Sequence, residues 1–111
     1  MNPFEFLKNA LTPKPIGPLP KDAVYIDVRS PEEFAVGSIP GSVHIPVNQI
    51  HLIASHKTQI DHSKSIIVFC ASGMRSGLAR RQLLSMGYSN VINGGGIASL
   101  AAQLSLEKKQ A

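Results

Sequence analysis

After its first twenty residues, the chain alternates four times between a short apolar run and a segment with helical spacing. The successive pairs of run and segment are 24–28 with 32–36, 43–45 with 49–56, 66–69 with 75–86, and 91–92 with 97–106. The runs are rich in β-branched residues, which favour strands. A repeated order of strand then helix predicts an α/β domain with a central, mainly parallel sheet flanked by helices.

Local signals for helix ends agree with these boundaries. Ser30 stands at a predicted N-cap, Pro31 at the first helical position and Glu33 three residues after the cap, which is the pattern of a capping box. Gly87 follows the third helical segment, and a glycine commonly ends a helix. We therefore expect one helix to begin near residue 31 and another to end before residue 87.

The first twenty residues differ from the rest of the chain. Residues 4–11 have the spacing of a short amphipathic helix, and four prolines follow between Pro13 and Pro20, where they oppose regular structure. The sequence therefore predicts a Pro-rich N-terminal extension over residues 1–20 and one domain over residues 21–111. A chain of 111 residues can bury one apolar core but is too short for two.

Charge and composition narrow the classes of function. Eleven Lys and Arg against seven Asp and Glu give a net charge of +4, and because the basic residues are scattered we expect no nucleic-acid binding. The positive balance favours anionic small molecules or an acidic protein partner. No stretch approaches the ~20 apolar residues of a membrane span, so we expect no membrane insertion. The single cysteine cannot form an internal disulfide, which favours a reducing, cytoplasmic setting.

The segment most informative about chemistry covers residues 66–76. A buried strand is expected to deliver Cys70 to its carboxyl end, which is where open parallel sheets place ligands. A loop of small residues that includes Gly73 then turns into a helix, so that backbone N–H groups and the amino end of the helix would face the sulfur. Together with the Arg75 guanidinium, these groups would stabilise a thiolate and lower the pKa of the thiol.

A lone cysteine at the end of an apolar strand is also often a small buried apolar residue with no chemistry. The adjoining loop with Gly73, the nearby Arg75 and the start of a helix favour the nucleophile over that interpretation. Four residues separate Cys70 from Arg75, one fewer than in the C-x5-R loop of cysteine phosphatases.

Several separated motifs resemble those of the rhodanese family. They are CASGMRS at 70–76 for the active loop C-x-x-G-x-R-S, DVRSPEEF at 27–34 with GSIPG at 37–41 and HIP at 44–46 for the first signature, and GY at 87–88 with VINGGGI at 91–97 for the closing segment. Together they cover about residues 21–104 and are highly specific as a set. The chain departs from the family where Ser38 replaces a frequent His and Leu100 a frequent Trp.

The resemblance implies a rhodanese-like sulfurtransferase. Cys70 would be the catalytic residue, taking a sulfane sulfur from a donor such as thiosulfate or a persulfide, carrying it as a persulfide, and passing it to cyanide or a thiol. The loop residues expected to bind substrate are Ala71, Ser72, Gly73, Met74, Arg75 and Ser76. Asp27 and Arg29, at the end of the first strand, are expected to support this loop. No metal or organic cofactor is implied, and the implied partners are the small sulfur donor and acceptor, with a sulfur-relay protein as a further candidate.

Two other functions stay open on the sequence. A non-catalytic rhodanese-like interaction module has no need of the retained Cys70, and a cysteine phosphatase or arsenate reductase of related fold would need the longer loop. The four histidines show no spacing typical of a metal site. Three consecutive glycines at 94–96 are expected to form a tight turn between a strand and a helix.

Overall fold

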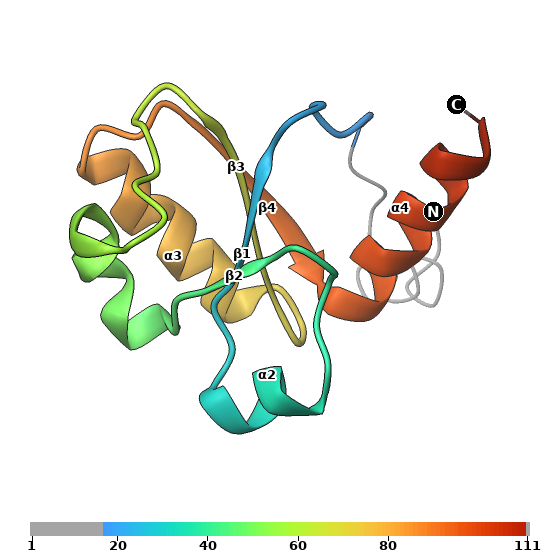
Figure 1. Cartoon of the computed structure of the whole chain (residues 1–111), viewed down its shortest axis with the longest axis horizontal. Coiled ribbons are helices and arrows are strands. Elements are labelled where there is room, and N and C mark those ends of the chain that lie inside the picture. The colour runs from blue at the N-terminus through green and yellow to red at the C-terminus, as the bar shows by residue number, and fades with distance from the viewer. Residues whose placement is uncertain (1–16, 111) are drawn as a thin grey trace, which may run out of the picture.

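The computed structural model of the chain describes residues 17–110, and Figure 1 shows their arrangement. The elements follow one another as β1 (Val24–Asp27), α2 (Pro31–Val36), β2 (Val43–His44), η1 (Val47–Ser55), β3 (Ser65–Cys70), α3 (Met74–Ser85), β4 (Asn90–Gly96) and α4 (Ile97–Gln110). The expected helix over residues 4–11 lies outside the described residues, as does most of the expected extension over residues 1–20.

The four strands form one sheet in the order β2-β1-β3-β4, and every neighbouring pair is parallel. This confirms the α/β class and the parallel sheet expected from the alternation of strands and helices. The register places Asp27 beside Phe69, and Cys70 beside Gly96. Because parallel strands end at the same edge of a sheet, the carboxyl ends of β1, β3 and β4 come together there.

The central strand β3 is buried on both faces, which accounts for its uninterrupted apolar sequence. Ile66, Val68 and Cys70 belong to the larger apolar cluster, which also contains residues of α3 and η1. Ile67 and Phe69 belong to the second cluster, which contains residues of α4. Helices therefore cover the sheet on both faces, with α3 and η1 on one side and α4 on the other (Figure 1).

The segment expected as a regular helix over residues 49–56 is a 3₁₀-helix, η1, and it begins two residues earlier at Val47. Ile50 and Ile53 are buried, and Val47 packs against the same cluster. Three apolar residues at intervals of three fit the three residues per turn of a 3₁₀-helix, because they then lie directly above one another.

The expectation of a turn at residues 94–96 is wrong, because all three glycines lie within β4 and α4 begins immediately after them. Val68 pairs with Asn93 and Phe69 with Gly95, so Gly94 is an extra residue that forms a β-bulge. Gly95 has a φ of 79°, which lies in the left-handed region that glycine adopts freely. α4 continues to Gln110, beyond the expected end at residue 106.

Residues just before β1 lie against the last helix. The backbone N–H of Leu19 donates to Glu107 Oε1 at 2.9 Å, and its side chain packs in the second cluster with Ile97 and Leu104 of α4. The stretch that joins the expected extension to the domain therefore has contacts of its own. Across residues 17–110, no helix has the length and apolar character needed to span a bilayer.

Candidate active site

Cys70 is the last residue of β3 and has no exposed surface. The strand that carries it lies between β1 and β4, so the thiol sits at the carboxyl edge of the sheet with a strand on either side. Its position is the one expected from the sequence. A free thiol placed there is held by packed backbone rather than by a mobile surface loop.

The loop after Cys70 curls so that backbone donors surround the sulfur. The Gly73 N–H donates to Cys70 Sγ at 2.9 Å, and the Ser76 hydroxyl oxygen lies 3.4 Å from the same sulfur. Gly73 is also the N-cap of α3 and has a φ of 97°, a left-handed conformation that a side chain would strain. The positive end of the α3 dipole therefore begins beside the thiol.

The surroundings of the sulfur favour its charged form. Burial raises the pKa of the Cys70 thiol, but hydrogen bonds from the Ser76 hydroxyl and from the backbone N–H groups of Ser76, Ser72 and Gly73 lower it by more. The pKa of Cys70 consequently lies below its ordinary value, in the direction expected from the sequence. A thiolate is the nucleophilic form of cysteine, so the arrangement suits attack on an electrophilic atom.

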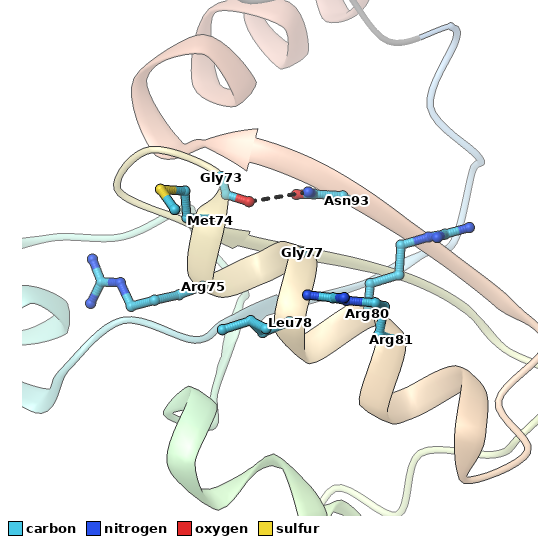
Figure 2. A pocket seen from close by; sticks show the side chains of 8 residues that line it. All are labelled: Gly73, Met74, Arg75, Gly77, Leu78, Arg80, Arg81 and Asn93. Atoms are coloured by element: carbon cyan, nitrogen blue, oxygen red, sulfur yellow. Dashed lines mark hydrogen bonds between the residues drawn. The ribbon is translucent and has the colours of Figure 1, made fainter.

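Asn93 of β4 fixes the loop, and the sequence analysis did not identify it. Its side-chain oxygen accepts from the Gly95 N–H at 2.9 Å and lies 2.7 Å from the Ser76 hydroxyl, whose one hydrogen can go to Asn93 or to the Cys70 sulfur. Its amide nitrogen donates to the Gly73 carbonyl at 3.2 Å, the contact drawn in Figure 2. The bulge at Gly94 follows Asn93 directly and aims this side chain at the loop. An amide in the interior of this strand, between apolar residues and glycines, was the signal in the sequence.

Gly96 lets β4 pass close beneath the loop. A Cβ atom at this position would lie 2.7 Å from the Ala71 carbonyl oxygen, which is closer than real contacts allow. Gly96 therefore allows the close approach of two backbones and does not form the turn that was expected.

The loop residues expected to bind substrate differ in whether their backbone or their side chain faces the sulfur. The backbone of Ser72 and Gly73 and both the backbone and hydroxyl of Ser76 face the sulfur. Ala71, Ser72 and Met74 have exposed side chains. The structure thus brings the backbone of the loop, more than its side chains, to the thiol.

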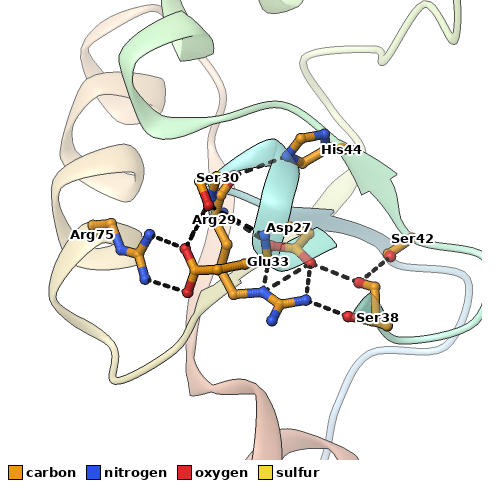
Figure 3. Close-up of polar contacts among 9 residues, drawn as sticks. Asp27, Arg29, Ser30, Glu33, Ser38, Ser42, His44 and Arg75 are labelled. Carbon is orange, nitrogen blue, oxygen red and sulfur yellow. Dashed lines mark hydrogen bonds and ion pairs between the residues drawn. The ribbon is translucent and has the colours of Figure 1, made fainter. Parts of the chain in front are cut away.

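The Arg75 guanidinium is bound to a carboxylate and does not donate to the sulfur. Its Nη1 and Nη2 atoms lie 2.6 and 3.1 Å from the two carboxylate oxygens of Glu33, and the two residues form the bidentate ion pair shown in Figure 3. Glu33 is also the N3 residue of the confirmed capping box and accepts from the Ser30 N–H. The Arg75 hydrogen bonds, followed by that of Ser30, lower the pKa of Glu33 to about 2, so the pair stays charged near neutral pH.

Asp27 and Arg29 form a buried ion pair at the end of β1 (Figure 3). The Ser38 hydroxyl donates to Asp27 at 2.7 Å, and Arg29 Nη2 donates to the Gly37 carbonyl at 2.6 Å. Burial raises the pKa of Asp27, and the hydrogen bonds from Arg29 and Ser38 lower it by more. Ser38, which replaces a frequent His of the family, is therefore part of this cluster. The pair ties the end of β1 to the segment after α2, beside the Glu33–Arg75 contact.

Comparison with protein-family models decides the family of this chain. The model of the rhodanese-like domain matches residues 16–103, which is most of the sequence. The chain belongs to the rhodanese-like domain family. Both the motifs at Cys70 and the parallel sheet that carries them are features of this rhodanese-like domain.

Similar proteins carry names that agree with this membership. A sulfurtransferase of Allochromatium vinosum is 35% identical over 82 residues, which cover 73% of this chain and 74% of that protein. A thiosulfate sulfurtransferase of Escherichia coli is 32% identical over 77 residues, covering 69% and 73%. A putative sulfur carrier protein of Bacillus subtilis is 37% identical over 68 residues, covering 61% of this chain and 35% of that protein.

The fold is shared with solved rhodanese structures. A rhodanese from E. coli, solved with anions, superposes with a TM-score of 0.62 at 33% identity and covers 71% of this rhodanese-like chain and 92% of its own. Sulfurtransferase activity is therefore supported at the level of the family, and a putative sulfur carrier protein is among the relatives.

Proposed function

We propose that this rhodanese-like domain is a sulfurtransferase that carries sulfur as a persulfide on Cys70. The observation that carries the proposal is the buried thiol at the end of β3, to which the Gly73 N–H donates at 2.9 Å and whose pKa the loop lowers. An activated thiolate in a ring of backbone donors suits covalent sulfur transfer, because the donors stabilise negative charge on either sulfur of a persulfide.

With thiosulfate as donor, the Cys70 thiolate attacks the outer sulfur of the donor. A new S–S bond forms to Cys70, and the S–S bond of thiosulfate breaks, so that sulfite leaves with the electron pair. The product on the protein is the Cys70 persulfide anion, held by the N–H groups of Ser72, Gly73 and Ser76. No step in this exchange needs a proton donor beside the sulfur.

The second half-reaction returns the thiolate. Cyanide or the thiolate of an acceptor attacks the outer sulfur of the persulfide, the Cys70 S–S bond breaks, and thiocyanate or a new persulfide leaves. The electron pair of the broken bond stays on Cys70, which is ready for another donor. The same loop can therefore stabilise the negative sulfur in both half-reactions.

Two alternatives are less well supported by the site. An interaction module has no use for a thiol whose pKa is lowered by a dedicated loop. A phosphatase needs an arginine for the phosphoryl oxygens. Here four residues instead of five separate Cys70 from Arg75, and Glu33 already binds Nη1 and Nη2 of the Arg75 guanidinium.

The test is mass spectrometry of the intact chain after incubation with thiosulfate, compared with Cys70→Ser. We expect the mass of one added sulfur on the wild-type chain, its loss on adding cyanide, and neither change in the variant. The same preparations are assayed with an aryl phosphate. Phosphate release that depends on Cys70, without any added sulfur, would overturn the proposal.

A further inference from the structure

We propose that the groove along α3, which begins at the Cys70 loop, docks an acidic and partly apolar segment of a protein that presents the acceptor thiol. This inference rests on the sulfurtransferase function proposed above and adds the kind of partner. The groove is lined by Gly73, Met74, Arg75, Gly77, Leu78, Arg80, Arg81 and Asn93, as Figure 2 shows.

The charge of the groove selects for carboxylates. Three of its lining residues are arginines, none is acidic, and α3 contains no Asp or Glu along its whole length. Arg75 is already paired with Glu33, so the attraction for carboxylates comes from Arg80 and Arg81. Arg80 Nε donates to the Val91 carbonyl at 2.8 Å, which holds that side chain at the edge of β4. Within residues 17–110, no hydrogen bond or ion pair engages Arg81, so its guanidinium is available to a partner.

The shape and the apolar surface of the groove favour a peptide over a small anion. Gly73 and Gly77 lie one helical turn apart on α3 and face Gly95 and Asn93 of β4, so no side chain of α3 narrows the groove on that side. Met74 and Leu78, also one turn apart, are 80% and 53% exposed. Large apolar side chains exposed in a groove that also holds Arg80 and Arg81 suit a segment that alternates acidic and apolar residues.

The position of the groove connects docking to chemistry. Gly73 lines the groove with its exposed side and donates its N–H to Cys70 Sγ, so a segment seated there ends at the reactive loop. A cysteine a few residues from such a segment would reach the persulfide. Small donors and acceptors have no segment to seat along α3, so we expect their reactions not to depend on Arg81.

The experiment compares two peptide acceptors and one small thiol. One peptide carries a single cysteine beside an alternating Glu-Leu tract, the second has Lys in place of every Glu, and the small thiol is 2-mercaptoethanol. Sulfur transfer from the preloaded full-length chain is followed by mass spectrometry. We expect the acidic peptide to react roughly tenfold faster than the Lys peptide at low salt, with the difference shrinking as salt rises.

Arg81→Glu is the test variant, and Lys108→Glu on α4 is its control because it makes the same change of charge away from the groove. Arg81→Glu should slow transfer to the acidic peptide about tenfold, while transfer to 2-mercaptoethanol and the thiosulfate reaction stay within twofold. Lys108→Glu should leave all three unchanged. Equal effects of the two variants, or none from Arg81→Glu, would overturn the docking proposal.

Direct binding separates this proposal from the proposed chemistry. The acidic peptide with Ser in place of its cysteine, labelled with a fluorophore, should bind the wild-type chain by fluorescence anisotropy and bind Arg81→Glu less tightly. Binding of this kind without persulfide formation would refute the proposed sulfurtransferase function but support the proposed docking along α3. Displacement of the peptide by an oligonucleotide that binds more tightly would instead make the arginines a nucleic-acid contact and overturn the proposal.

Discussion

Replacing Gly96 with Ala tests whether the close approach of β4 to the loop is needed for activity. The added Cβ would lie 2.7 Å from the Ala71 carbonyl oxygen, whereas ordinary contact begins at 3.4 Å, so the two backbones must separate by 3.4 − 2.7 = 0.7 Å. The backbone conformation of Gly96 is one that alanine also adopts, so this contact is the main perturbation. Overpacking of this kind costs about 1–3 kcal/mol of stability.

The displaced atoms belong to the loop whose N–H groups surround Cys70. Since misplacing reacting groups by about 1 Å costs on the order of 100-fold in rate, a shift of 0.7 Å should lower kcat/KM for thiosulfate and cyanide by roughly 10- to 50-fold. Turnover is measured beside the melting temperature, which shows that the variant is folded at the assay temperature. Gly17→Ala is the control, because a Cβ there meets no atom of residues 17–110 within 4 Å. Wild-type turnover and melting in Gly96→Ala would refute the reasoning.

Three further predictions concern the thiol and the ion pair beside it. Cys70→Ser should abolish sulfur transfer and leave the melting temperature within a few degrees, and any remaining wild-type turnover would contradict a persulfide on Cys70. Ser76→Ala removes the hydroxyl that lowers the pKa of Cys70, so the midpoint of alkylation by iodoacetamide against pH should move upward, and an unchanged midpoint would exclude that hydroxyl as the cause. Glu33→Gln keeps a side-chain oxygen for the Ser30 N–H but removes the negative charge that holds Arg75. The value of kcat/KM should then rise about threefold for thiosulfate and stay unchanged for a neutral trisulfide donor. Equal changes for both donors would show that Arg75 does not act on the incoming anion.

Features encoded by neighbouring residues were predictable from the sequence. The alternation of strands and helices gave the parallel sheet, and the spacing of Ser30, Pro31 and Glu33 gave the start of α2. Gly87 follows α3 with a φ of 96°, as expected of a glycine that ends a helix. Each of these depends on a pattern a few residues long, which sequence alone displays.

Features that depend on distant partners were not predictable in this way. Arg75 is 42 positions from Glu33, and Asn93 is 17 positions from Ser76, so no local pattern joins them. Three glycines in a row suggested a turn because nothing in the sequence showed that the Ala71 carbonyl would lie against Gly96. The sequence did not predict that η1 is a 3₁₀-helix, because periods of 3.0 and 3.6 residues differ little over nine residues.

Backbone N–H groups hold the sulfur of Cys70, whereas Arg75 is paired with Glu33, and this difference bears on which group the site can transfer. Backbone N–H groups carry no net charge and cannot titrate, so those of Ser72, Gly73 and Ser76 stabilise a thiolate or persulfide at any pH at which the fold persists. A phosphoryl group brings two or more negative charges and three oxygens, which call for a free guanidinium. In this chain that guanidinium is held by Glu33, whose pKa of about 2 keeps it charged. A ring of neutral donors with its nearby cation already paired therefore suits the single charge of a persulfide and disfavours a phosphoryl group.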